Sequence, residues 1–277
     1  MEKPTYINWI VTEENVVLDN GEPITCYRLD YTNDEAVLDD WALHIRRHYI
    51  SDDELEEGCG LLDLTPEEYL KQLIIPQKSE SRLSGTARSN GISEILFSDL
   101  LEFVLKFEVP RCRFDNMSGK TVSEHGTDVI AYEFFNADKK PDSKDMLATV
   151  EVKAELTSQK ADVIDKAVED ACKDEYRLAQ TLDYMRRKLI RMNMPEKAKD
   201  ILRFQNKTKY DYQIEHYAAG ISSLPQIPNG VIDGTNVKII PEIDGNKLRL
   251  KGDAHIYYVH GERLMELAHR VYDRCVK

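Results

Sequence analysis

The chain has 277 residues, which suffices for one large domain or two closely joined ones. Hydrophobic residues make up 42% of it and charged residues 31%, and no apolar run approaches the roughly 20 residues that cross a bilayer. The N-terminus lacks the apolar stretch of a secretory signal, so we expect a cytoplasmic protein with no membrane contact. The five cysteines are scattered and form no Cys-x-x-Cys pair, which argues against structural zinc and against a disulfide framework.

The formal net charge is -13. A protein that binds DNA by itself usually has a basic surface, because neutralising phosphates supplies most of the sequence-independent affinity. If this acidic chain acts on DNA, either local basic patches hold the substrate or a partner presents it.

Apolar and polar residues alternate over residues 5–31 around Asp19-Asn20-Gly21, which predicts a β-hairpin. Residues 77–91 are polar and small, which favours a linker or a mobile loop. Between these segments the sequence predicts helices that begin at capping residues: one from Asn33 or Asp34 to Tyr49, and one from Thr65-Pro66 toward Leu73. We therefore expect an N-terminal strand-and-helix region over residues 1–90.

Residues 91–277 alternate between helical and strand patterns. The predicted elements are a helix over 92–107 ended by Pro110, a short strand near 111–114, strands at 129–135 and 147–156, a long helix over 158–192, a helix over 195–205, two or three strands between 212 and 259 with a hairpin at Asp244-Gly245-Asn246, and a helix over 262–275. This order predicts an α/β fold with a mixed central β-sheet flanked by helices.

One predicted strand has a face on which a carboxylate and an ammonium lie side by side. Val150 and Val152 alternate with Glu151 and Lys153, and Asp128 precedes them where the previous strand begins. Adjacent strands lie about 4.8 Å apart, so the two carboxylates can share one small hard cation. We expect Asp128, Glu151 and the carbonyl of Val152 to bind Mg²⁺ or Mn²⁺, with Lys153 positioning water and stabilising charge. A Glu-x-Lys tripeptide is also typical of a solvated strand face.

The order Asp, then Glu-x-Lys, resembles the PD-(D/E)xK nuclease superfamily, which has a restriction-endonuclease-like core. In that superfamily a helix before the core strands often carries another acid. Glu94 occupies this place, and Phe97 and Leu101 on the same helical face turn it inward. The resemblance implies that Glu94 supports the metal site. Gln180 and Tyr184 match a Q-x-x-x-Y pattern that follows Glu-x-Lys in one branch, and they are candidates for substrate or supporting contacts.

Three segments together are similar to the HamA family, the nuclease subunits of Hachiman anti-phage defence. They are residues 92–102 (ISEILFSDLLE), 125–128 (HGTD) and 150–153 (VEVK). The resemblance covers residues 92–184 and implies a Mg²⁺-dependent deoxyribonuclease that works beside a superfamily 2 helicase, HamB. DNA presented by a helicase would also account for the net acidic charge.

Several polar residues have an open role. His125 could touch substrate or stabilise a turn. A basic cluster could contact phosphate or a partner, or be exposed charge: Arg186, Arg187, Lys188 and Arg191. His44 and His48 have the i, i+4 spacing of zinc ligands, but two arginines lie between them, so we expect structural or surface histidines.

Two other functions remain open at this point. The chain could be a stand-alone restriction-like endonuclease, or a nuclease-like sensor or inhibitory subunit with little catalysis.

Overall fold

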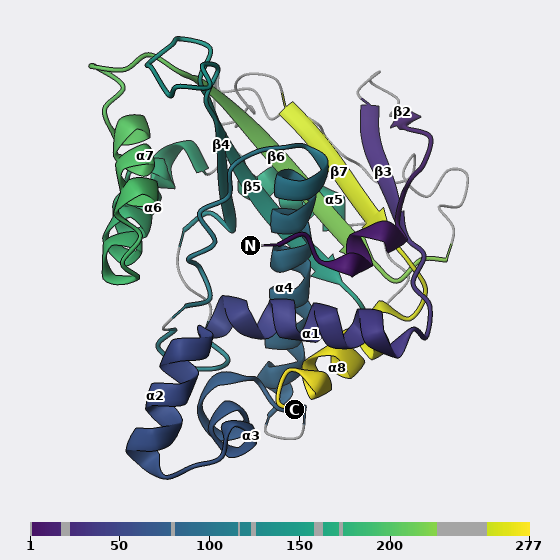
Figure 1. Ribbon diagram of the computed structural model, residues 1–277. Coiled ribbons are helices and arrows are strands. Elements are labelled where there is room, and N and C mark those ends of the chain that lie inside the picture. The colour runs from purple at the N-terminus through teal and green to yellow at the C-terminus, as the bar shows by residue number, and fades with distance from the viewer. Residues whose placement is uncertain are drawn as a thin grey trace.

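The computed structural model describes residues 2–17, 23–78, 81–115, 117–122, 126–157, 163–171, 174–225 and 254–277. These residues form one seven-stranded mixed sheet flanked by helices, which confirms the predicted α/β class (Figure 1). The strands are β1 (Ile10–Thr12), β2 (Val16–Val17), β3 (Pro23–Leu29), β4 (Val129–Glu133), β5 (Met146–Glu155), β6 (Gln213–Ser222) and β7 (Ala254–His260). Within the described ranges, none of the helices combines the length and the apolar character that crossing a membrane requires.

The sheet has the strand order β1-β3-β7-β6-β5-β4, and β2 also pairs with β3. The central strands β3, β7, β6 and β5 run parallel to one another, whereas β1 and β2 pair antiparallel with β3, and β4 pairs antiparallel with β5. The N-terminal strand β3 therefore lies beside β7 from the C-terminal part. The turns predicted at Asp19-Asn20-Gly21 and Asp244-Gly245-Asn246 lie outside the described residues.

The described helices are α1 (Glu35–Tyr49), α2 (Asp52–Leu62), α3 (Pro66–Tyr69), α4 (Arg82–Asp99), α5 (Val163–Ala171), α6 (Asp174–Arg191), α7 (Pro195–Gln205) and α8 (Leu264–Arg274). A 3₁₀ helix, η1 (Thr5–Trp9), precedes β1, and π-helical turns extend α3 and α4 as η2 (Leu70–Ile74) and η3 (Leu100–Val104). The Asp34 carboxylate accepts the N–H groups of Ala36 and Val37, which confirms the predicted start of α1.

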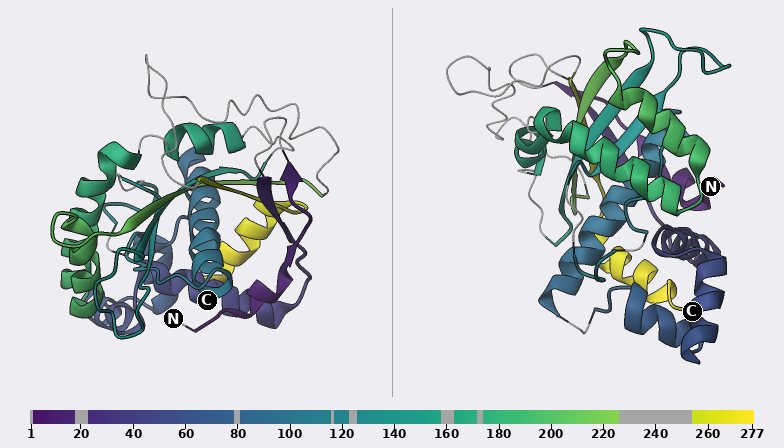
Figure 2. Two further views of the ribbon diagram at one scale, coloured as in Figure 1. Left: turned by 90° about the horizontal axis from the view of Figure 1, so that it is seen from above. Right: turned by 90° about the vertical axis from the view of Figure 1, so that its left-hand side faces the viewer.

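Helices cover both faces of the sheet (Figure 2). On one face α1, α4 and α8 pack together, and the core there includes Leu96 of α4 and Val150 of β5. On the opposite face α5 packs Ile164 against Tyr258 of β7. Because helices cover both sides of β5, most of its residues are buried. A polar residue there is either paired or functional.

The loop predicted over residues 77–91 is wrong, since α4 begins at Arg82. Ser81 caps the helix, and the buried guanidinium of Arg88 donates to the carbonyl of Pro76 at 2.7 Å and to Asp273 at 2.7 Å. These long-range contacts stabilise helix in a polar stretch whose local pattern indicates none. The predicted division near residue 90 falls inside α4 and stays a prediction about organisation.

The single long helix predicted over 158–192 is also wrong. Two helices stand there, because they pack against different surfaces: α5 lies on β5 and β6, whereas α6 packs with α7. Leu182 of α6 belongs to a separate core with Ile130 of β4. The strand predicted near 111–114 is wrong as well. Arg111 has a φ of 54°, a left-handed conformation that interrupts an extended strand.

Candidate active site

Asp128 lies at the edge of the sheet, where β4 leaves part of β5 without a neighbouring strand. β4 pairs Val129 with Val150, and continuing that antiparallel register by one residue places Asp128 opposite Glu151. The Asp128 Oδ2 atom accepts the backbone N–H of Val152 at 2.9 Å. Asp128 thus takes the place of a further β4 residue and brings a carboxylate beside Glu151 and Val152.

Lys153 follows one pleat along β5, and its ammonium lies between two acids. Its Nζ is 2.7 Å from Asp170 Oδ2 of α5 and 3.6 Å from Glu151 Oε2. Burial alone would lower the pKa of Lys153, but the hydrogen bond with Asp170 and the charges of Asp128 and Glu151 raise it above its ordinary value. Lys153 is therefore a cation at neutral pH.

Asp170 was missed in the sequence. It belongs to no motif, and only its place on the helix that follows β5 could have indicated it. It pairs with Lys153 more closely than Glu151 does, so it fixes where the ammonium lies.

Glu94 is turned inward from α4, as expected, and it is fully enclosed, with 7% of the residue exposed. The guanidinium of Arg113 joins it to Asp128. Arg113 Nε is 2.6 Å from Glu94 Oε2, and Nη2 is 2.8 Å from Asp128 Oδ1. Burial raises the pKa of Glu94 to about 8, Arg113 limits the rise, and Asp128 adds to it.

A small pocket of about 160 Å³ lies beside these groups. Glu94, Asp128, Val152, Lys153 and Glu155 are among the residues that line it, whereas Glu151 is not. Glu155 also accepts a hydrogen bond from the Thr157 hydroxyl at 2.8 Å, in keeping with a peripheral position. The pocket thus brings Glu94, Asp128 and β5 together as the sequence predicts.

Helix α6 packs against the segment that leads into Asp128 and also contacts the backbone of Arg113. Gly126 has a φ of 109°, and a Cβ atom on it would lie 2.8 Å from Thr181 Oγ1, so glycine lets the chain pass close to α6 before it reaches β4. Further along α6, Lys188 Nζ donates to the carbonyl of Arg113 at 3.0 Å and to the Tyr184 hydroxyl at 3.1 Å. The Tyr184 hydroxyl thus contacts the Lys188 side chain, which in turn holds the backbone of Arg113.

The predicted basic cluster divides into buried and exposed members. Lys188 is buried, which corrects its assignment to a phosphate-binding surface, because its ammonium is used in holding the backbone of Arg113. Arg186 and Arg187 both pair with Asp183, and Arg191 is exposed. Arg186, Arg187 and Arg191 therefore remain candidates for contact with phosphate, whereas Lys188 does not.

Of the two remaining candidates, Gln180 is exposed on α6. His125 lies outside the described residues.

A second group of potential ligands lies elsewhere, between α1 and α4. In the described part of the chain, His44, His48 and Asp99 are the one set of three His, Cys, Asp or Glu residues whose ligand atoms all lie within 4.8 Å. Arg111 Nη2 is 2.6 Å from Asp99 Oδ1, and Nη1 is 2.7 Å from His48 Nε2. Since a guanidinium at the centre of the group repels a metal cation, we assign these residues to a structural network.

The protonation of His48 agrees with that assignment. Burial, His44 and Arg111 lower the pKa of His48 to about 3, so the ring is neutral. Its Nδ1 lies 2.9 Å from the carbonyl of His44 and carries the proton, which leaves Nε2 to accept from Arg111.

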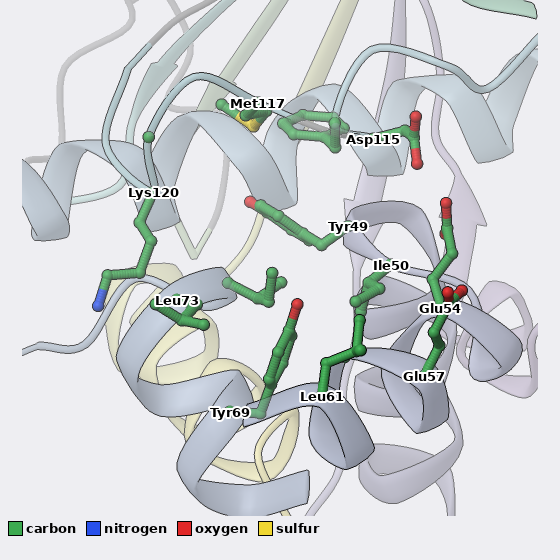
Figure 3. A pocket seen from close by; sticks show the side chains of 14 residues that line it. Tyr49, Ile50, Glu54, Glu57, Leu61, Tyr69, Leu73, Asp115, Met117 and Lys120 are labelled. Atoms are coloured by element: carbon green, nitrogen blue, oxygen red, sulfur yellow. The ribbon is translucent and has the colours of Figure 1, made fainter. Parts of the chain in front are cut away.

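A larger pocket, of about 290 Å³, lies between α1, α2 and α3 (Figure 3). Tyr49 and Tyr69 point into it, and carboxylates lie along one side: Glu54, Glu57 and Asp115. Those acids disfavour a phosphate backbone. Its described lining includes neither Asp128 nor residues of β5, so it is separate from the acidic site.

Comparison with known families finds a match over most of the chain. The family model of HamA matches residues 4–275, which is nearly the whole chain. A comparison with curated proteins finds no match.

Proposed function

Because the chain belongs to the HamA family, we propose that it is the metal-dependent DNA nuclease of a Hachiman anti-phage defence system, working in complex with a superfamily 2 helicase, HamB. One observation carries the nuclease proposal. Continuing the β4–β5 register by one residue places Asp128 opposite Glu151, Asp128 accepts the backbone N–H of Val152, and Lys153 Nζ lies 3.6 Å from Glu151 Oε2, at the sheet edge beyond the end of β4.

The chemistry of the donor groups fits Mg²⁺ or Mn²⁺. Asp128 and Glu151 offer carboxylate oxygens, Val152 offers a backbone carbonyl, and hard cations of this size prefer such ligands. Glu151 is 3% exposed and lies beside the Lys153 ammonium, and its charged form is favoured by cations near it. A bound ion would lower the pKa of an attacking water and offset charge on the phosphate.

Lys153 supplies the fixed positive charge of the proposed mechanism. As a protonated ammonium held by Asp170 and Glu151, it can donate to the attacking water or to a phosphate oxygen. Because its position is set by two acids from different elements, little reorganisation is needed when negative charge develops. Glu94 supports the site from α4 through Arg113 and Asp128.

The proposed partnership follows from charge as well as from the family. The net charge of -13 opposes autonomous binding to DNA. Of the basic residues on α6, Arg187 and Arg191 are exposed, and they are available for phosphate or for the partner. A helicase that presents DNA would supply the missing affinity.

The proposal is tested with the purified chain, alone and with HamB, on linear and circular DNA in Mg²⁺, Mn²⁺ or chelator. We expect DNA loss that needs both the metal and the helicase, and that disappears in Lys153→Ala. Full, sequence-specific cutting by the chain alone would favour a stand-alone endonuclease.

The second candidate function is a sensor or inhibitory subunit. One observation favours it: the guanidinium of Arg113 pairs with both Glu94 and Asp128, two of the carboxylates of the proposed metal site. DNA loss that is unchanged by Lys153→Ala would favour that alternative.

A further inference from the structure

Arg113 stands at the position where the acidic site would need a cation. Its guanidinium donates to Asp128 at 2.8 Å and to the carbonyl of Thr127 at 2.8 Å, and it lies 2.6 Å from Glu94. Among the described residues, Glu94, Asp128 and Glu151 do not form a set with all ligand atoms within 4.8 Å. The carboxylates are thus spaced around a side chain rather than around an ion.

We propose that Arg113 is a tethered cation that occupies the acidic site in the absence of metal and turns into a neighbouring pocket when a divalent cation binds. The proposal rests on the proposed metal site, and it adds a residue that the sequence motif does not contain. It makes metal binding an exchange between a side chain and an ion.

The competition follows from charge and from hydrogen bonding. Like charges a few ångströms apart in a poorly solvated site repel strongly. The guanidinium also uses acceptor oxygens of Asp128 and Glu94 that an ion would need. Without metal, the guanidinium of Arg113 offsets the charge of the Asp128 carboxylate. With metal, its presence there becomes unfavourable.

A neighbouring pocket is the space into which the Arg113 side chain turns in this proposal. A pocket of about 120 Å³ borders both Arg113 and Glu94 on the side of α4, and Ala87 contributes to its lining. Phe114 is among the residues that line both this pocket and the one drawn in Figure 3. Space on either side lets the segment adjust around a moving side chain.

The backbone of Arg113 stays anchored while the side chain turns. Lys188 is buried and donates to the Arg113 carbonyl. Rotation about the side-chain bonds therefore suffices for the exchange, and the loop itself need not unfold. The pocket beside Ala87 becomes a requirement for metal binding, which gives the proposal a test independent of catalysis.

The test is a calorimetric titration of Mn²⁺ into the full chain and four variants: Arg113→Gln, Ala87→Leu, the double variant and Asp128→Asn. Arg113→Gln is expected to bind Mn²⁺ at least about tenfold more tightly, as the loss of a competing charge-assisted contact implies. Ala87→Leu fills the pocket and keeps helix propensity, so it is expected to weaken binding. In the double variant the Ala87→Leu effect should vanish, because no arginine needs the space.

A matched control is Arg28→Gln on β3, which removes an arginine paired with Glu13 and Asp30 far along the sheet. It should bind Mn²⁺ like the unmodified chain. Equal affinity in Arg113→Gln and the unmodified chain, with binding lost in Asp128→Asn, would overturn the exchange while leaving the metal site intact. An Ala87→Leu effect that persists in the double variant would overturn it too. Absence of Mn²⁺ binding in every variant would remove both the exchange and the proposed metal site.

Discussion

The Asp128 carboxylate accepts a hydrogen bond from the backbone N–H of Val152 at 2.9 Å, across the point where β4 ends. A main-chain group of β5 therefore helps to fix the position of this acid. Its other oxygen points to Arg113. Asp128 thus binds the main chain of β5 beyond the end of β4 and also brings a negative charge to the site.

Asp128→Asn separates these two roles. The amide oxygen can still accept from Val152, so we expect the fold to remain, but the charge that would hold a cation is gone. We predict a loss of metal-dependent DNA cleavage of about 100-fold or more, the size typical of removing one charge-stabilising group. Cleavage rate and melting temperature are measured on the same preparation. Cleavage that survives in a variant with unchanged melting temperature would remove Asp128 from the metal site.

Asp170→Asn tests the positioning of Lys153. Asp170 raises the pKa of Lys153, so its removal lowers that pKa. If the protonated ammonium is required, activity falls at high pH, and this fall should begin at a lower pH in the variant. The pH–rate profile of the nuclease complex gives the shift. Glu169→Gln, an exposed acid on the same helix, is the matched control. Equal profiles for Asp170→Asn and the control would mean that Asp170 has no such role.

Gly126→Ala tests the approach of the chain to α6. Its φ of 109° and the 2.8 Å distance from a built Cβ to Thr181 Oγ1 predict destabilisation of about 1–3 kcal/mol. Gly60→Ala on α2 is the control, because a Cβ there has no atom within 4 Å. Alanine in that helix should stabilise by about 0.5–1 kcal/mol. Chemical denaturation measures both, and a neutral Gly126→Ala would contradict the account of this turn.

The raised pKa of Glu94 predicts that the free energy of unfolding depends on pH. Its pKa is raised from 4.5 to about 8 on folding, chiefly by burial. Between these values the folded state holds a proton that the unfolded state releases, so Glu94 lowers the free energy of unfolding as pH rises from 4.5 to 8. Glu94→Gln should be more stable relative to the unmodified chain at pH 8 than at pH 5. Denaturation in chelator at both pH values measures the difference, and a constant difference would contradict the shift.

Much of the acidic site could be predicted because its strands carry strong local patterns. The alternation around Glu151 and the position of Asp128 are properties of short segments, and a two-residue period fixes which side chains share a face. Glu94 follows from helical periodicity. The placement of these residues agrees with the register of β4 and β5.

The site residues that the sequence did not indicate are held by contacts between segments far apart in the chain. Arg113 reaches Glu94 and Asp128 from an irregular segment, and Asp170 reaches Lys153 from α5. The first half of α4 looks like a loop because its residues are small and polar, and the buried Arg88 in it pairs with a distant partner, Asp273. No local pattern encodes such pairings. The burial of Lys188 is of the same kind.

The central claim is that Asp128, which directly precedes β4, and Glu151 of β5 form a carboxylate pair that makes this chain a metal-dependent nuclease. The most direct measurement is DNA loss by the chain together with its helicase in Mg²⁺, comparing the unmodified chain with Glu151→Gln at matched folding. The account predicts that the unmodified complex degrades DNA and that the Glu151→Gln complex, folded and assembled, leaves it intact. Degradation at the same rate by both complexes would contradict it.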